Sequence, residues 1–597
     1  MRNIALALAI GCGSPPVVNG PVEPAGDVPT APATPEPLTA PSDATATLPA
    51  RRSTPLVGGT LLTASTADDI VYASDPENDR IFALNTDVRR IAWQVDLPRG
   101  AEPFRLAEAG GALFVTLRGV GGLARVDLAS SELTVLPGCD QPRGLAWDAA
   151  REVLFVACAG GELERRAADG ALVSSTWIDG DLRDVVPLAS TVLVSRFRTA
   201  EVLTLDPWTL AVLDRRAPAP VVENEALETE KRFEPHVAWR MIQGKGNEVI
   251  VSHQLQQTTE VPLGSGEESN AGAYGTSVEC GMVRSVITRF SGGDGQPVSS
   301  PAFVSTALPL DIVLHDGDLE LLSGADNSLG FVGGLQEQED ATCAESLVQA
   351  RFSFDGRAAA VAYDGAGRLV VAKQAPFGVF VDYQDMFIHV PAGGPERAFE
   401  LFHQETPSGL ACASCHPEGT DDGHVWQFGG IGLRRTQNLA VGLADTAPFH
   451  WDGEFEHTQE LLADVMVERM GGRPVSENVA EGLLTWMDGL APVRVTPSGN
   501  ADAIARGEAL FFSPDLACAS CHAGPAYTSA GAQDIGHGMP LETPSLVGVG
   551  GRGPWMHDGC ALTLEQRFLD AECGGTLHGG TVDPADVPDM VAYLETL

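Results

Sequence analysis

Short apolar runs of β-type composition recur between about residue 55 and residue 390. Each run is four or five residues long and is bounded by Gly, Asp or Asn. Seven of them are spaced by roughly 40 residues, with wider gaps later in the region: IVYAS, LFVTL, LFVAC, VLVSR, VIVSH, LELLS and LVVAK. Several precede a second apolar strand, such as DRIFALNTD. Four short strands per unit at this period are typical of a β-propeller, so we predict an all-β propeller of about seven blades over residues 55–390. An irregular all-β sandwich is the alternative.

Helical periodicity replaces the strand pattern from about residue 391. The segments PERAFELF and ARGEALFF both have the pattern of amphipathic helices, and each precedes a copy of the heptapeptide LACASCH. The two copies, at 410–416 and 516–522, are 106 positions apart, and so are the segments APFHWDG and GPWMHDG that follow them. The spacing indicates a tandem duplication. We therefore predict two all-α domains, over residues 391–497 and 498–597.

The repeated heptapeptide contains the Cys-x-x-Cys-His pattern of c-type haem attachment. Two thiols at this spacing form thioethers with the two vinyl groups of haem, and the adjacent histidine binds the iron. A zinc ribbon would need its second cysteine pair within about 20 residues, and a redox Cys-x-x-Cys does not require the histidine. We therefore predict two covalent haems, attached through Cys412, Cys415 and His416 in the first copy and through Cys518, Cys521 and His522 in the second.

The opposite face of each iron calls for a second ligand, which cytochrome c domains usually take from a later loop. The segments RMGG and LHGG occupy similar places after the two motifs, which makes Met470 and His578 the candidate metal ligands. Both residue types bind haem iron, and methionine raises the potential relative to histidine. Both residues also have an ordinary interpretation, Met470 in a hydrophobic core and His578 beside the terminal helix. Further candidates are His424, His450, Met466, His537, Met539, Met556 and His557.

The two Cys-x-x-Cys-His motifs, with FHWDG after the first and TPSLVGVGGRGPWMHDG after the second, resemble the bacterial di-haem cytochrome c peroxidase and MauG family. The resemblance covers roughly residues 390 to 597, about a third of the chain. It implies two packed cytochrome c domains, one haem taking electrons from a donor and the other reducing hydrogen peroxide to water at an open iron position. By position, the haem of His416 would be peroxidatic, and the haem of His522 would receive the electrons.

Two positions depart from the pattern of this family. The family carries a glutamine after the first WDG and a glutamate before the methionine of EMG, whereas this chain has Leu461 and Arg469 there. Loss of an acid or base that moves a proton lowers a rate by a factor on the order of 10² to 10⁴. The residues that would take over this role are Gln459 and the candidate catalytic acids Asp452, Glu460 and Glu468.

The first twelve residues, MRNIALALAIGC, resemble a bacterial lipoprotein signal that ends at Cys12, the lipid-bearing residue of such signals. A truncated ordinary signal peptide is the alternative, and either one places the chain in the periplasm or at the cell surface. Residues 13–54 are rich in Pro, Ala and Thr, which predicts a disordered tether. No later stretch reaches the roughly 20 apolar residues of a spanning helix, so we expect membrane contact only through a lipid at Cys12.

Acidic residues outnumber basic ones by 80 to 38, which gives a net charge of −42. Such a surface argues against binding to nucleic acid or to an anionic membrane, and it steers cationic partners towards the protein. We therefore expect a redox partner protein such as a small basic cytochrome or a cupredoxin.

Six cysteines remain beyond Cys12 and the two haem motifs. In an oxidising compartment they are expected to form disulfides. Proximity in the sequence suggests the pairs Cys139–Cys158, Cys280–Cys343 and Cys560–Cys573.

Two functions fit these features. The first is an extracytoplasmic di-haem oxidoreductase of the peroxidase or MauG type, whose propeller is a docking or shielding platform. The second is a non-enzymatic electron carrier, in which Met470 and His578 complete both irons and the propeller binds a redox partner. In a third hypothesis the propeller is itself the catalyst, but it carries no quinone or metal signature. His236 and His253 lie beside insertions in the propeller, either near a haem edge or as ordinary blade residues.

Overall fold

The computed structural model describes residues 54–224, 230–263, 273–275, 280–291, 295–304, 306–332, 348–352, 355–382, 384–386, 397–440, 443–444, 446–536, 538–570, 573 and 578–597. The predicted signal and nearly all of the predicted tether therefore lie outside the described residues. Residues 51–597 form one compact unit. Over the described ranges, no helix is long and apolar enough to cross a membrane.

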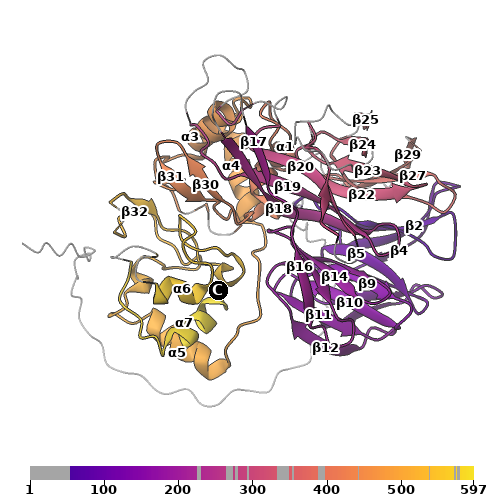
Figure 1. Ribbon diagram of the computed structural model, residues 1–597, viewed down its shortest axis with the longest axis horizontal. Helices are drawn as coiled ribbons and strands as arrows, with labels where there is room; N and C mark the ends of the chain where they lie inside the picture. The colour runs from indigo at the N-terminus through magenta and orange to yellow at the C-terminus, as the bar shows by residue number, and fades with distance from the viewer. Residues whose placement is uncertain are drawn as a thin grey trace, which may run out of the picture. The chain divides into compact units, whose positions relative to one another are not determined.

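Seven antiparallel sheets occupy the chain from Leu61 to Met386 (Figure 1). The first four sheets each have four strands: β1 (Leu61–Thr63), β2 (Ile70–Asp75), β3 (Arg80–Asn85) and β4 (Arg90–Asp96); β5 (Pro103–Ala109), β6 (Ala112–Leu117), β7 (Leu123–Asp127) and β8 (Leu133–Leu136); β9 (Pro142–Asp148), β10 (Val153–Cys158), β11 (Glu162–Arg166) and β12 (Leu172–Trp177); β13 (Leu182–Pro187), β14 (Val192–Arg196), β15 (Val202–Leu205) and β16 (Val212–Arg216). The fifth sheet has five strands and the last two have four: β17 (Val221–Asn224), β18 (Glu230–Gln243), β19 (Val249–Gln257), β20 (Val283–Phe290) and β21 (Val298–Ser299); β22 (Pro309–His315), β23 (Asp318–Ser323), β24 (Ser328–Val332) and β25 (Val348–Arg351); β26 (Arg357–Tyr363), β27 (Leu369–Gln374), β28 (Gly378–Val381) and β29 (Gln384–Met386).

These sheets form a closed ring. Their inner strands contact one another in the order β1, β5, β9, β13, β18, β22 and β26, and β26 contacts β1 again. A closed ring of seven such sheets is a seven-bladed β-propeller. The predicted propeller is therefore confirmed, and the sandwich alternative is wrong.

The seven apolar runs of the sequence are the strands next to the inner strand of each blade. They form β2, β6, β10, β14, β19, β23 and β27. Every residue of β6, for example, is buried, because adjacent blades cover both faces of this strand. Strands buried on both faces have continuous apolar sequences, whereas outer strands such as β12 alternate between exposed and half-buried residues.

Charged side chains link the inner strands around the axis of the ring. The Arg105 Nε on β5 lies 2.7 Å from Oδ1 of Asp184 on β13, and Arg240 on β18 bridges Asp184 and Asp311 at 3.3 and 3.2 Å. Burial alone would raise the pKa of Asp184, but Arg105 and Arg240 hold that pKa below its ordinary value. The blades are therefore tied together at the centre by ion pairs as well as by apolar contacts.

The C-terminal third contains seven α-helices within the described residues. Those of the first repeat are α1 (Arg397–His403), α2 (Cys412–Cys415), α3 (Thr458–Leu462) and α4 (Glu477–Asp488), and those of the second are α5 (Ala501–Phe511), α6 (Leu564–Leu569) and α7 (Val587–Leu594). Each repeat also has a two-stranded ribbon: β30 (Val425–Phe428) with β31 (Gly432–Arg435), and β32 (Ala532–Gln533) with β33 (Leu541–Glu542). The prediction of all-α domains is therefore wrong in this respect, because the segment after each Cys-x-x-Cys-His motif returns as a hairpin.

The backbone repeats the 106-residue spacing of the sequence. His450 and Met556 both have positive φ, at 74° and 71°, and Gly453 and Gly559 follow at 65° and 68°. Isolated β-bridges close both loops, between Phe449 and Phe455 in the first copy and between Trp555 and Ala561 in the second. The two copies therefore share their unusual local conformations as well as their motifs.

Disulfides join Cys139 to Cys158 and Cys560 to Cys573, as predicted. Cys280 is also disulfide-bonded, and its predicted partner Cys343 lies outside the described residues. The four cysteines of the two LACASCH segments are free thiols.

Candidate functional site

Each LACASCH segment forms a short helical turn that presents its cysteines and histidine together. Helix α2 contains Cys412 and Cys415, and a 3₁₀ turn begins at Cys518 in the second copy. Burial raises the pKa of Cys412 to about 11, and it raises the pKa values of Cys415 and Cys518 as well. Burial therefore favours the protonated form of these sulfurs.

The two histidines of the motifs are oriented in the same way. His416 Nδ1 lies 3.3 Å from the carbonyl oxygen of Thr420, and His522 Nδ1 lies 3.1 Å from that of Tyr527. A carbonyl at Nδ1 places the ring proton there, which leaves the Nε2 lone pair for a metal. Burial lowers the pKa of both histidines, so both imidazoles are neutral at pH 7. Each motif thus presents a neutral ligand in a fixed orientation.

His578 lies opposite His522. The centres of the two imidazole rings are 6.2 Å apart, and their planes are inclined by 42°. Two imidazoles that bind opposite faces of one metal ion through bonds of about 2 Å have ring centres roughly 6 Å apart. The second motif and His578 therefore have a spacing that fits an iron held between two histidines.

Met470 lies in the same apolar cluster as the first motif. It follows a π-helical turn, Ala463–Arg469, and is 5% exposed. Its neighbours in the cluster include Leu410 and Cys415 of the first LACASCH segment and Trp426 of β30. One cysteine of the first motif, Cys415, therefore packs in the same cluster as this buried methionine.

The three candidate catalytic acids are not gathered in one place. Asp452 lies 3.2 Å from the guanidinium of Arg434, and its side chain is 30% exposed. Glu460 is exposed, and its carboxylate accepts a hydrogen bond from the backbone N–H of His457 at the start of α3. Glu468 is exposed as well. Glu460 and Glu468 therefore lack the buried setting that a proton-transferring acid usually has.

Most of the other candidate ligands have different partners. His424 contacts His236 of β18 through Nδ1, at 3.1 Å, and the carbonyl of Gln257 through Nε2, at 2.9 Å. His253 is fully buried in β19, with both ring nitrogens in hydrogen bonds, so it is a blade residue. His450 pairs with Glu454, Met466 lies in the main core, and the sulfur of Met539 faces Arg434. His537 lies outside the described residues.

Propeller arginines surround an acidic residue beside the first motif. Glu418, two residues after His416, is buried against Arg118, Arg143 and Arg183 from three successive blades. These arginines hold the pKa of Glu418 below its ordinary value, although burial opposes them. No sequence pattern predicts this contact, because Glu418 lies more than 200 positions from each of the three arginines.

The propeller also reaches the Met470 side of the first motif. The backbone N–H of Tyr274, from an insertion in the fifth blade, donates to the carbonyl of Arg469 at 2.8 Å. The Tyr274 side chain is hydrogen-bonded to Arg469 and lies in the cluster that contains Met470 and Cys415. Arg469 also pairs with Asp464 at 2.5 Å. Propeller residues therefore contribute to both the Glu418 and the Met470 sides of the first site.

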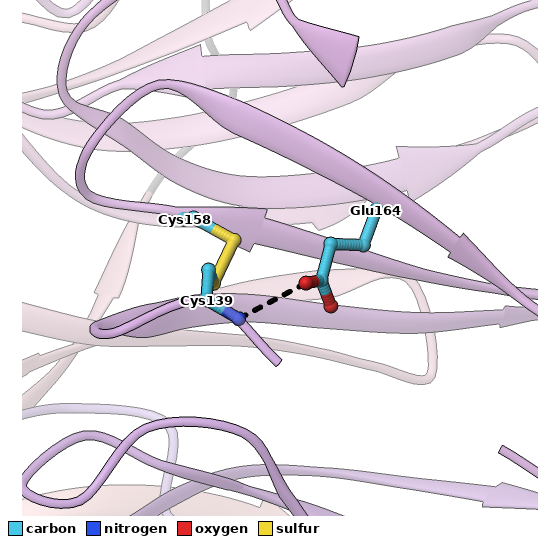
Figure 2. Close-up of side chains that lie close together, drawn as sticks. All are labelled: Cys139, Cys158 and Glu164. Atoms are coloured by element: carbon cyan, nitrogen blue, oxygen red, sulfur yellow. Dashed lines mark hydrogen bonds between the residues drawn. A yellow bond between two sulfur atoms is a disulfide. The ribbon is translucent and has the colours of Figure 1, made fainter. Parts of the chain in front are cut away.

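A second group of potential metal ligands lies in the third blade and the loop before it. Figure 2 shows Cys139, Cys158 and Glu164 close together, with the Glu164 carboxylate accepting a hydrogen bond of 2.9 Å from the backbone N–H of Cys139. Both sulfurs are joined in a disulfide, and Glu164 also pairs with Arg166 at 2.9 Å. The group therefore stabilises the blade and is not a metal site.

The fold and the two motifs together define a seven-bladed propeller joined to a duplicated Cys-x-x-Cys-His region. No protein-family model matches the chain. Three curated relatives match its C-terminal part, and the first is hydrazine synthase subunit gamma of Kuenenia stuttgartiensis, with 24% identity over 253 residues that cover 31% of this chain and 72% of that protein. Methylamine utilization protein MauG of Methylorubrum extorquens is 27% identical over 261 residues, which cover 32% of this chain and 72% of MauG. Cytochrome c551 peroxidase of Nitrosomonas europaea is 24% identical over 253 residues, which cover 32% of this chain and 74% of the peroxidase. The resemblance of this region to the di-haem peroxidase and MauG family is thereby confirmed.

A chain of Kuenenia stuttgartiensis hydrazine synthase aligns with 59% of this chain and all of its own length, at 13% identity and a TM-score of 0.44. A streptogramin B lyase structure aligns with 56% of this chain and 95% of its own length, at 12% identity and a TM-score of 0.38.

Proposed function

We propose that this protein is an extracytoplasmic di-haem c-type cytochrome of the peroxidase and MauG type. Cys412 and Cys415 would attach the first haem and Cys518 and Cys521 the second, with His416 and His522 as proximal ligands. The observation that carries this proposal is the shared orientation of the two histidines, each held at Nδ1 by a backbone carbonyl. Covalent haem supplies one-electron chemistry at a potential that its axial ligands tune.

The two sites have different roles in this proposal. The ring of His578 lies 6.2 Å from that of His522, so the two histidines would hold the second iron together, which would suit the second site to passing electrons. The first site has a buried thioether, Met470, in the corresponding position of the duplication. We assign peroxide reduction to the first site, and the relatives named MauG and cytochrome c551 peroxidase support this assignment.

Proton handling at the first site has to differ from the family pattern. Arg469 stands where the family has a glutamate, and its charge is neutralised by Asp464. Asp452 is half-buried and held by Arg434, which makes it the best placed of the three predicted acids. We propose that Asp452 moves the proton during peroxide reduction, with Glu460 and Glu468 as less favourable candidates because both are exposed.

One experiment tests this function directly. The purified protein, matured with a c-type haem attachment system, should contain two haems that acid-acetone does not extract. Electron paramagnetic resonance of the oxidised and half-reduced protein should then show a high-spin signal that hydrogen peroxide abolishes. Two low-spin centres that do not respond to peroxide in either state would contradict the enzymatic assignment.

A non-enzymatic electron carrier is the second candidate. The observation that favours it is the 5% exposure of Met470 within the cluster of the first motif, since a bound thioether would leave no open position. In this case the propeller would bind a redox partner, and the same spectra would show two low-spin centres. Retention of both haems without peroxide turnover would select this function.

The proposed location is the periplasm or the cell surface. Disulfides within the propeller and the second repeat fit an oxidising compartment. The proposed lipid anchor at Cys12 lies outside the described residues. A net charge of −42 would draw a basic cytochrome or cupredoxin towards the protein, so we expect association to weaken at high salt.

A further inference from the structure

A buried carboxylate, Asp421, lies where three parts of the chain meet. It follows the first motif by five residues and is 0% exposed. Arg198, in the turn after β14 of the propeller, lies 3.4 Å from its Oδ1, and Arg435, at the end of β31, lies 2.7 Å from the same oxygen. One carboxylate of the first repeat is therefore shared between the propeller and the repeat itself.

The same two guanidinium groups also reach the second repeat. Arg198 donates through Nη1 to the carbonyl of Gly551 at 2.6 Å, and Arg435 donates to the carbonyl of Arg552. Arg198 further donates from Nε to the backbone carbonyl of Asp421 at 3.0 Å. Arg198 is thus bonded at once to the loop after the first motif and to the loop before GPWMHDG in the second repeat.

The backbone at this junction leaves no spare room. Gly423 has φ of +72°, and a Cβ at this position would lie 3.0 Å from Cδ of Arg198 and 3.1 Å from the carbonyl oxygen of Gly553. The loop of the first repeat therefore passes closely between the propeller arginine and the second repeat, and its positive φ favours glycine. Close packing of this kind transmits small displacements instead of absorbing them.

We infer that Arg198 and Asp421 form a positioning pair through which the propeller fixes the two haem segments relative to each other. This inference rests on the proposed function, and it assigns the propeller a structural part in electron transfer between the two haems. In this inference both residues act through the loops that they hold. Two hydrogen bonds and one ion pair on the planar guanidinium of Arg198 restrict orientation as well as distance, which a lysine ammonium cannot reproduce.

The test compares Arg198→Lys with Arg215→Lys in the full-length, haem-loaded protein. Arg215 is a matched control, because it lies in the same blade and pairs with Asp179 and Glu201, but its side chain is 43% exposed. Electron equilibration between the two haems is followed optically after rapid reduction of one of them. We expect Arg198→Lys to slow this step about tenfold or more, with haem content and absorption spectra unchanged, because small displacements of positioned reactants have large effects on rate. Equal rates in the two variants would overturn the inference.

A second measurement applies even where Arg198→Lys does not fold. In Asp421→Asn, amide hydrogen exchange should become faster at residues 420–424 of the first repeat and at 548–553 of the second, while the blade strands stay protected. Unchanged exchange in the second segment would overturn the inference. Exchange can be measured without haem, so the absence of two covalent haems would refute the proposed function and leave this test intact.

Discussion

The imidazole rings of His522 and His578 face each other at 6.2 Å, although the two residues belong to segments 56 positions apart in the sequence. This spacing makes His578 the candidate for the second ligand of the second haem. Replacing His578 by methionine should raise the midpoint potential of that haem, since a thioether stabilises the reduced iron relative to imidazole. A spectroelectrochemical titration measures the shift. His457→Asn, a change at an exposed helix cap, is the control, and a potential that does not move would contradict the ligand assignment.

Two substitutions separate the packing of the Met470 side chain from a bond between its sulfur and iron. Met470→Leu keeps the apolar volume and removes the sulfur, so it should convert the first haem to a high-spin form only if Met470 binds iron. The electron-carrier function predicts this conversion in the oxidised protein, whereas the peroxidase function predicts no change in spin state, because the first iron is then already open. If Met470 only packs, the leucine variant should resemble the wild type, while Met470→Ala should lower stability by about 2–5 kcal/mol.

Arg469 occupies the position of the family's glutamate. The double variant Asp464→Asn/Arg469→Glu introduces that carboxylate without placing it beside the negative charge of Asp464. We expect its peroxide turnover to rise on the order of 10²-fold, the usual contribution of a positioned proton donor. Asp464→Asn alone is the control and should not raise turnover. A double variant that is no faster, despite full haem content, would show that this position does not face the reacting oxygen atoms.

Glu418 should be needed for the propeller and the first repeat to stay together. Glu418→Gln would leave Arg118, Arg143 and Arg183 without their shared carboxylate, and breaking such a buried cluster usually lowers stability by about 3–5 kcal/mol. Calorimetry of the full-length protein should show a lower unfolding temperature. Asp96→Asn removes the exposed carboxylate of a surface ion pair and should change the temperature little. Similar shifts in the two variants would contradict the role given to Glu418.

Glu542 predicts a pH dependence of stability. It is 9% exposed on β33, and burial raises its pKa to about 8 from 4.5. The unfolded chain ionises near pH 4.5, whereas the folded protein keeps the proton, so stability falls as pH rises from about 4.5 towards 8. Glu542→Gln should therefore match the wild type at pH 4 and exceed it by up to about 3 kcal/mol at pH 7. Denaturant titrations at both pH values measure the difference, and a variant that is less stable at pH 7 would contradict it.

The sequence predicted the propeller because the second strand of each blade is buried on both faces and is therefore uniformly apolar, as in β6. It also predicted the two disulfides seen among the described residues, since each closes a short loop. The two-stranded ribbons, such as β30 with β31, were missed, because strands of two to four residues leave no clear alternation.

The sequence predicts candidate site residues where their chemistry is local. The motif residues follow from Cys-x-x-Cys-His alone, and His578 and Met470 followed from the duplication. Contacts such as Arg198 with Asp421 join residues 223 positions apart through single charged side chains. No periodicity marks such a residue, so the part that the propeller has in the first site emerges only from the folded chain.

The ring of blades also constrains the order of assembly. Contacts between β1 and β26 join segments about 300 positions apart, and Leu56, just before β1, donates its N–H to Nε2 of His403 on α1. Distant pairings of this kind form slowly, because a long loop must close before any contact is gained. Arg118, Arg143 and Arg183 surround Glu418 only when blades two, three and four have packed together. We therefore expect the first repeat to pack against a propeller that has already folded when the protein is made.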